Sequence, residues 1–427
     1  MQHLLSTRRL RAVAAGAVAL ALVLTGCSSE ESFSYTPPAQ VEQTLPEDTT
    51  AQLQAAVEHA MAKTGATGAI VGVWVPWSGT WVTGLGTQSV EDQTAVSPDM
   101  SFRVADATRM MTCEVLYALA DEEVVELDDL VPDYVSGVAH MDEITLLDLC
   151  NGTSGAGSSE GTVRSMWLNT PERVWAPLEL ASFGLGKTPV APHTTYRDSD
   201  SGYLLLGLAL ERASGMSASE LIARYVSSPL DLAGTSLPRP AAAPPGDNAL
   251  SGNRLPAIEG GYNCTAPVDI TTISSSTGFT DSGAVSTIDD LGRYVQAAAN
   301  QGLRDGAEPD RYASPLPVSA EAPSWYQATG GAYLVGPLVG QHGWTPGYAT
   351  AAYSDPTTGF TVAVVLNNST AGSSPIAHLA WELAAIASKA PAADGQTAPE
   401  FGLPFTAEQY HAAIEGLTIC ATPPAAE

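Results

Sequence analysis

The chain has 427 residues, of which 44% are apolar and 15% charged, and its formal net charge is −28. An apolar fraction of this size can fill the core of one large domain. Because a strongly negative chain repels phosphate groups, this composition excludes nucleic acid as a partner and argues against electrostatic adhesion to anionic lipid.

The N-terminal segment has the features of a secretion signal. Its first eleven residues carry three arginines, and the apolar run AVAAGAVALALVL that follows is too short to span a bilayer, which takes about 20 apolar residues. The run closes on LTGC at residues 24–27, which is similar to a bacterial lipoprotein box. This resemblance implies a signal peptide at residues 1–26, a lipid on Cys27 and an extracytoplasmic protein anchored to the cell membrane. The alternative is an ordinary signal with a chance cysteine.

The first predicted elements follow a polar segment. Residues 27–50 are rich in Ser, Thr, Pro and acids, which predicts a flexible tether between the lipid and the domain. The run AQLQAAVEHAMAKTG has apolar residues at helical spacing, which predicts a first helix that ends at Gly65. The β-rich runs AIVGVWVP and TWVTGLG, split by a turn at residues 77–79, predict a hairpin.

The rest of the domain reads as helices followed by strands. Residues 107–225 are predicted to be mostly helical, and the runs GAYLVGPLVG, YATAAYSDP and FTVAVVLNN are predicted strands before a last helix, SPIAHLAWELAAIAS. Strands at both chain ends with helices between them predict one α/β domain of the α+β kind over residues 51–390, in which these strands share an antiparallel sheet. Residues 391–427 form a predicted C-terminal extension with one helix candidate at 407–415.

The cysteines agree with export. Besides Cys27 the chain has Cys113, Cys150, Cys264 and Cys420, an even number without CxxC spacing, which suits disulfides better than a zinc or redox site. Three pairings are open from the residues alone. The seven histidines show no metal-ligand spacing, so we expect no metal and no cofactor.

Five segments, in order over most of residues 51–390, resemble the serine β-lactamase and D-alanyl-D-alanine carboxypeptidase (penicillin-binding) superfamily in its class C-like branch. They are FRVADATRMMTCEVLYALADEEVVELDD from Phe102, ITLLDLCNGTSG from Ile144, PHTTYRDSDSGYLLLGLALERASG from Pro192, DSGAVSTIDDLGRYVQA from Asp281 and GQHGWTPGY from Gly340. The resemblance implies a β-lactamase-like fold, an antiparallel sheet flanked by helices with a helical subdomain. It also implies that Cys113 pairs with Cys150 and Cys264 with Cys420.

In that family a serine attacks the carbonyl carbon, while a lysine one helical turn later and a tyrosine of the second motif handle its proton. The matching positions here hold other residues: Asp106 and Arg109 for serine and lysine, Asp198 and Asp200 for tyrosine and asparagine, and Gln341 for the third-motif lysine or histidine, with Gly343 retained. An arginine stays protonated at any working pH and cannot act as a base. We therefore expect the catalytic set to be lost.

Two nearby residues could take over a lost role. Tyr196 would reach the tyrosine position only through a two-residue slip, which breaks the gapless match that ends at Tyr203. His342 directly follows Gln341, but neighbouring side chains of a strand point to opposite faces. Neither residue is expected in the cleft.

The leading interpretation is a lipid-anchored, catalytically inactive envelope protein that binds or scaffolds, with a peptidoglycan peptide or an envelope protein as its partner. One alternative is a rewired hydrolase of the β-lactamase, DD-peptidase or esterase kind that uses Asp106, Asp198 or Ser199. Another is a hard-cation site made by Asp106, Asp198 and Asp200. We expect instead that Arg109 bridges to Asp198 or Asp200, because an unpaired buried charge is costly.

The third motif also predicts a change at the wall of the cleft. Trp344 stands where the family usually has a small residue. An indole there brings on the order of 200 Å² of ring surface. We expect this ring to line the cleft and, with the Arg109 ion pairs, to close it.

Overall fold

The computed structural model describes residues 35–304, 306 and 308–420. Every described residue belongs to one compact unit. The expected signal peptide and Cys27 therefore lie outside the described residues. Within the described part of the chain, no helix combines the length and the apolar character needed to cross a bilayer.

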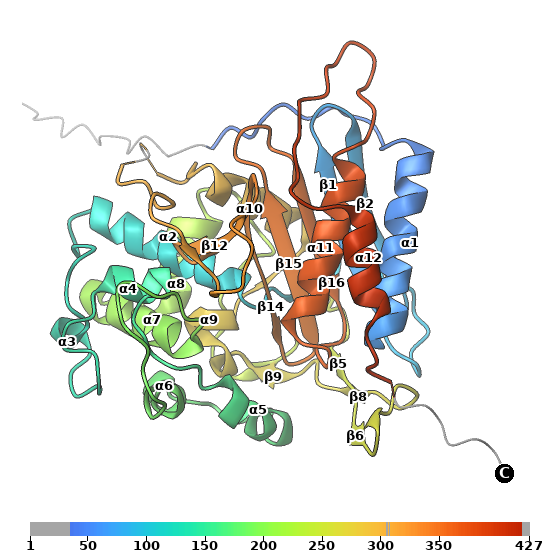
Figure 1. Cartoon of the computed structure of the whole chain (residues 1–427). Helices are drawn as coiled ribbons and strands as arrows, with labels where there is room; N and C mark the ends of the chain where they lie inside the picture. Colours follow the sequence, from blue (N-terminus) through green and yellow to red (C-terminus); the bar gives the residue numbers. More distant parts are fainter. Residues whose placement is uncertain (1–34, 305, 307, 421–427) are drawn as a thin grey trace, which may run out of the picture. The chain divides into compact units, whose positions relative to one another are not determined.

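An eight-stranded antiparallel sheet forms the centre of this unit (Figure 1). Its strands are β1 (Gly68–Val75), β2 (Gly79–Gly86), β11 (Leu316–Pro317), β12 (Tyr326–Thr329), β13 (Ala332–Val335), β14 (Leu338–Thr345), β15 (Tyr348–Ser354) and β16 (Thr361–Leu366). The order is β11-β12-β13-β14-β15-β16-β1-β2, so β1 pairs with β16 and places Ile70 opposite Val365. This pairing confirms the prediction that strands from both chain ends share one sheet.

The remaining strands are two residues long and form four small pairs outside this sheet. They are β3 (Phe102–Arg103), β4 (Ala242–Ala243), β5 (Asn253–Arg254), β6 (Ala257–Ile258), β7 (Gly261–Tyr262), β8 (Val268–Asp269), β9 (Ile273–Ser274) and β10 (Val285–Ser286). The pair β3–β10 joins the start of the first motif segment to the fourth motif segment, just after Asp281.

Helices cover both faces of the sheet (Figure 1). They are α1 (Glu47–Thr64), α2 (Ala107–Asp121), α3 (Val131–Tyr134), α4 (Leu146–Asn151), α5 (Glu160–Asn169), α6 (Pro177–Leu185), α7 (Asp200–Ser214), α8 (Ala218–Ile222), the π-helix η1 (Ala223–Ser227), the 3₁₀ helix η2 (Ser275–Thr277), α9 (Phe279–Ser282), α10 (Ile288–Ala299), α11 (Ser373–Ala387) and α12 (Ala407–Glu415). Ile70 packs toward α10 and Val71 toward α11, because successive side chains of a strand face opposite sides.

Helix α2 connects the sheet with the predicted helical subdomain. It contacts β14 on one side and the helices α4, α7 and α9 on the other. The disulfide between Cys113 and Cys150 ties α2 to α4, with the two Cα atoms 5.5 Å apart. This pairing is the one that the resemblance implied, and it holds the first two motif segments together.

The predicted domain boundaries need correction at both ends. The expected tether at residues 27–50 ends too late: Tyr35 and Leu45 are buried, and α1 begins at Glu47. The expected extension after residue 390 is also part of the domain, since α12 packs on α1 and α11. Both segments carry apolar side chains that the core buries, and the disulfide Cys264–Cys420 fastens the second one as the resemblance implied.

Candidate functional site

The site lies at the start of α2, where Asp106 precedes the helix and Arg109 follows one turn later. Ala105, just before them, has a φ of 50°, a left-handed conformation that is uncommon for a residue with a Cβ. This turn brings the Asp106 side chain against β14. The first turn of α2 thus aims both side chains at the space between the sheet and the helical subdomain.

Arg109 holds three carboxylates. Its Nε donates to Oδ1 of Asp281 at 2.7 Å, its Nη1 donates to Oδ1 of Asp198 at 2.6 Å, and its Nη2 lies 3.4 Å from Oδ2 of Asp106. The guanidinium also lies 4.9 Å from the ring centroid of Tyr203. The expected bridge from Arg109 therefore goes to Asp198, and Asp281 is a partner that the sequence did not predict.

Asp106 fills the space beside the β14 backbone. A Cβ placed at Gly343 would lie 2.1 Å from Cγ of Asp106, which is far inside van der Waals contact. Glycine is therefore required at position 343 because the carboxylate of Asp106 occupies the room that a side chain would need. The side chain of Asp106 is 14% exposed, so little solvent reaches it.

The charges of this site do not balance. Burial raises the pKa of Asp106 well above its usual range and that of Asp281 to about 6, and the attraction of Arg109 offsets only part of this cost. Burial opposes the charge of Arg109, but the surrounding carboxylates outweigh it and raise the pKa of its guanidinium. Several carboxylates therefore share the one guanidinium of Arg109. The Asp198 side chain is 56% exposed, so the excess negative charge lies next to solvent.

Asp200, the other expected partner of Arg109, makes different contacts. Its Oδ1 accepts a hydrogen bond from the Ser159 backbone N–H at 2.6 Å, and its other oxygen accepts from the Ser159 hydroxyl. Asp200 is the first residue of α7 and so joins the start of that helix to the start of α5. Among the described residues it makes no ion pair with Arg109, and Asp281 takes the place that we expected it to fill.

The hydroxyl of Ser199, a candidate nucleophile of the rewired-hydrolase hypothesis, forms hydrogen bonds that stabilise the fold. It donates to the Gly157 carbonyl at 2.9 Å and accepts from the Gly202 N–H as the N-cap of α7. The side chain is buried. A hydroxyl that is engaged in both of these bonds is not poised to attack a carbonyl.

Strand β14 presents Gln341 and His342 to opposite faces. The Gln341 amide donates to the Gly331 carbonyl at 3.0 Å on the α2 side of the sheet. The His342 ring stacks on Tyr333 on the α11 side, and burial lowers the pKa of this imidazole to about 3. Tyr196 donates to the Tyr333 hydroxyl at 3.3 Å and does not bond to Arg109. Neither His342 nor Tyr196 restores the missing base.

Helix α5 adds residues that the sequence did not single out. The guanidinium of Arg164 covers the ring of Trp344 at 4.2 Å from its centroid, and this indole is buried in the cluster on the α11 face of the sheet. Because successive side chains of a strand face opposite sides, Trp344 lies on the other face from Gly343 and Asp106, and the expectation that its ring lines and closes the cleft is not met. Burial, with Asp198 as the next cause, raises the pKa of Glu160 to about 7. Both Glu160 and Arg164 come from a segment without a motif.

A metal does not fit the arrangement around Arg109. The carboxylates of Asp106, Asp198 and Asp281 all face its guanidinium, which occupies the position that a cation would need. In residues 35–304, 306 and 308–420 no group of three or more His, Cys, Asp or Glu side chains is arranged to hold a metal ion. The ion-pair network is therefore favoured over the hard-cation hypothesis.

Comparisons with known proteins agree with this architecture. The model of the Beta-lactamase family matches residues 53–386. A D-stereospecific amidohydrolase from Streptomyces sp. superposes with a TM-score of 0.65 at 21% identity, over 74% of this chain and 94% of that chain. A D-amino acid amidase from Ochrobactrum anthropi SV3, complexed with L-phenylalanine amide, gives a TM-score of 0.65 at 19% identity, over 75% and 92%.

A third solved structure is the octameric penicillin-binding protein homologue from Pyrococcus abyssi. It superposes with a TM-score of 0.65 at 20% identity, over 79% of this chain and 77% of that chain. At such identities the likeness to solved structures concerns the fold. The chemistry has to be judged from the residues at the start of α2.

Proposed function

The chain belongs to the beta-lactamase family, and from that premise we propose that it is a catalytically inactive member that works by binding or scaffolding. The order of its five motif segments favours the class C-like branch. The lipoprotein-box resemblance at Cys27 supports an extracytoplasmic protein held at the membrane by its lipid. Family and fold leave the activity open, so the proposal depends on the site itself.

The observation that carries the proposal is the set of contacts made by Arg109. Acyl transfer needs a nucleophile whose proton can pass to a neighbouring base. Arg109 cannot take that proton, because the carboxylates around it raise its pKa further. Asp106 is wedged against Gly343 and paired with Arg109, and attack by a carboxylate on an amide would produce an anhydride in place of an ester.

The partner we propose is a peptidoglycan peptide or an envelope protein. Two structural neighbours are named for D-stereospecific or D-amino acid amide chemistry and one for penicillin binding, which supports a peptide-like ligand. The exposed carboxylate of Asp198 and the nearby Glu160 give the site an excess of negative charge. Such a site favours a ligand with a positively charged group.

One observation favours a second candidate, a hydrolase with a rewired site. The pKa values of Glu160 and Asp281 are raised to about 7 and about 6, which is the range in which a carboxyl group exchanges protons at neutral pH. Groups of this kind gather at catalytic sites, although ion networks perturb pKa values as well. An activity assay separates the two candidates.

The assay uses a fluorescent penicillin, a chromogenic cephalosporin and a D-amino acid amide on the purified chain. We expect no stable label and no turnover above buffer. Restoring the family residues in part, as Asp106→Ser with Arg109→Lys, should give little activity, because catalytic groups act as a unit. Adding Asp198→Tyr to that pair supplies the missing proton carrier. Turnover by the unaltered chain that Asp106→Ala abolishes would establish the rewired hydrolase.

The lipid anchor has its own test. Metabolic labelling with a fatty acid should mark the full chain, and Cys27→Ala should remove the label and release the protein from the membrane fraction. Equal membrane recovery of both forms would contradict the anchor without touching the proposal on activity.

A further inference from the structure

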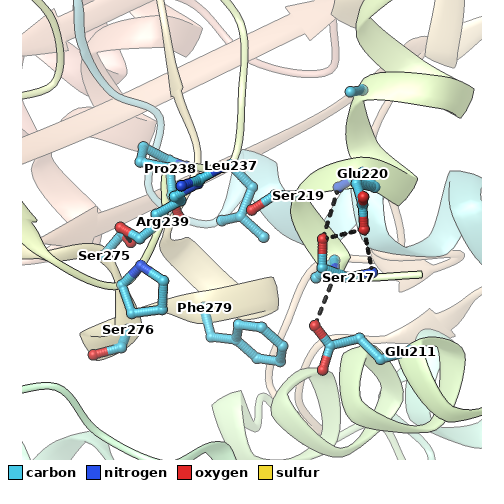
Figure 2. Close-up of a pocket in the computed structure, with 13 residues that line it drawn as sticks. Glu211, Ser217, Ser219, Glu220, Leu237, Pro238, Arg239, Ser275, Ser276 and Phe279 are labelled. Atoms are coloured by element: carbon cyan, nitrogen blue, oxygen red, sulfur yellow. Dashed lines mark hydrogen bonds between the residues drawn. The ribbon is translucent and has the colours of Figure 1, made fainter. Parts of the chain in front are cut away.

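A cavity that does not include Arg109 in its lining lies beside the first residue of α9, Phe279 (Figure 2). It has a volume of about 440 Å³, which is within the range of sites for small ligands. Its walls come from the end of α7, the start of α8, the loop at residues 237–240, η2 and the first residue of α9. No motif segment of the family resemblance predicted this cavity.

Hydrogen bonds fix the walls of the cavity in place. The Ser275 hydroxyl donates to the carbonyls of Pro238 and Arg239 at 3.0 and 2.9 Å, which holds the 237–240 loop against η2. On the opposite wall the Ala218 N–H donates to Oε1 of Glu211 at 2.8 Å, which joins α7 to α8. A cavity whose walls are tied in this way is formed before a ligand arrives, so binding costs less ordering entropy.

The floor is apolar and includes an unusual backbone. Phe279 lies below the hollow in Figure 2, and Leu237 and Pro240 complete the apolar lining. Phe279 has a φ of 40°, a conformation that side chains other than glycine rarely adopt and that tends to occur where a ligand is held. Two residues further along the same short helix, Asp281 binds Arg109, so the two sites share α9.

The charged groups of the cavity are of opposite sign and lie on opposite walls. Figure 2 shows Arg239 on one side of the hollow and Glu211 on the other. Among the described residues neither of them has an ion-pair partner. Glu220, the third charged residue of the lining, is used by its capping box with Ser217.

From this geometry we propose that the cavity binds a short zwitterionic peptide with an apolar side chain. Arg239 receives the terminal carboxylate, Glu211 receives the terminal ammonium, and Phe279 with Leu237 covers the side chain. A single amino acid carries its two charges on one carbon, whereas the ends of a dipeptide or tripeptide can reach two walls. This inference does not rest on the proposed function, because it concerns other residues and another cavity.

Calorimetric titration of the full chain with the dipeptide leucyl-leucine tests the proposal. Its N-acetyl form lacks the ammonium and its C-terminal amide lacks the carboxylate, and each should bind roughly tenfold more weakly than the zwitterion, because each loses a charge-assisted hydrogen bond. No measurable binding of leucyl-leucine, or equal binding of all three peptides, would overturn the proposal.

Two variants assign the binding to this cavity. Arg239→Gln should weaken leucyl-leucine roughly tenfold and leave the C-terminal amide unchanged, and Glu211→Gln should do the same with respect to the N-acetyl form. Glutamine at 211 can still accept from the Ala218 N–H, so the wall is kept. Arg224→Gln, on the nearby π-helix η1 and outside the cavity lining, is the matched control and should change nothing. Binding that neither variant weakens would place the peptide elsewhere and refute the inference.

Discussion

Two buried arginines, Arg109 within α2 and Arg311 packed against it, show how the same side chain serves two purposes. Arg311 donates to Oε2 of Glu114 at 2.6 Å and to the carbonyls of Gly330 and Met110, and the side chains of this pair are 1% and 2% exposed. Arg109 is equally buried but faces three aspartates, one of which is open to solvent. The first arrangement is neutral and dry, whereas the second carries an excess of negative charge to the surface.

The difference separates a structural pair from a site. A single carboxylate and two carbonyls satisfy Arg311, so the pair fastens α2 to the segment that precedes β11 and offers nothing to a ligand. Around Arg109, burial and then the neighbouring carboxylates raise the pKa values of Asp281 and Glu160, and the exposed carboxylate of Asp198 keeps a negative potential at the surface of the site. An arginine whose charge is balanced by one carboxylate stabilises the fold. Carboxylates in excess of the arginine charge can instead attract a positively charged ligand.

The largest expected effect comes from breaking the dry pair. Arg311→Met removes the cation that pairs with Glu114 and leaves a buried carboxylate, which should lower the free energy of unfolding by about 3 to 5 kcal/mol. Urea denaturation followed by circular dichroism measures it. Arg224→Met, which breaks an exposed pair with Glu122, is the control and should cost less than about 1 kcal/mol. Equal losses in the two variants would show that the Arg311 pair is not dry.

A smaller effect, dependent on pH, is expected at the other arginine. Arg109→Met should cost about 2 to 3 kcal/mol at pH 8, less than a fully buried pair, because solvent reaches Asp198. The cost should shrink toward pH 5, where Asp106 and Asp281 can take up protons and need no cation. The same denaturation experiment at both pH values checks this, and a cost that is independent of pH would make the two arginines alike.

The sequence predicted the sheet because its strands carry enough residues to show a pattern. The hairpin β1–β2 and the strands β15 and β16 are apolar or β-branched runs between turns, and strands at both chain ends predicted a shared sheet. The run GAYLVGPLVG was predicted as one strand, whereas the structure divides it into β13 and the first residues of β14. The two-residue strands from β3 to β10 escaped prediction, since two residues have no periodicity. Their positions depend on contacts between distant parts of the chain.

The candidate site was predicted in its positions and only partly in its contacts. Matching the motifs placed Asp106, Arg109 and Asp198 together, because the family's catalytic groups converge there. The third carboxylate was wrong, since which acid reaches Arg109 depends on how α9 packs on α2 and not on spacing along α7. Asp281 was visible as the first residue of the fourth motif segment, but no pattern in the sequence predicted a partner for it.

The smallest effect concerns Glu160, an acid of α5 close to Asp198. Its pKa is raised to about 7 in the folded protein, mainly by burial and then by Asp198, whereas the pKa of a glutamate in the unfolded chain is about 4.3. Between these values the folded state keeps a proton that the unfolded state releases, so the stability contributed by this group falls as pH rises through about 4 to 7.

Glu160→Gln removes this dependence. The variant should match the unaltered chain near pH 4 and exceed its stability at pH 8 by about 1 to 2 kcal/mol, a figure reduced from the full pKa shift because solvent screens a partly exposed group. Thermal unfolding across that pH range measures the difference, with Glu143→Gln on an exposed loop as the control. A difference that stays flat with pH would mean that Glu160 feels no surplus charge. The charge of Arg109 would then be balanced by its carboxylate partners, as the charge of Arg311 is. The site would in that case have no excess negative charge to attract a positively charged ligand.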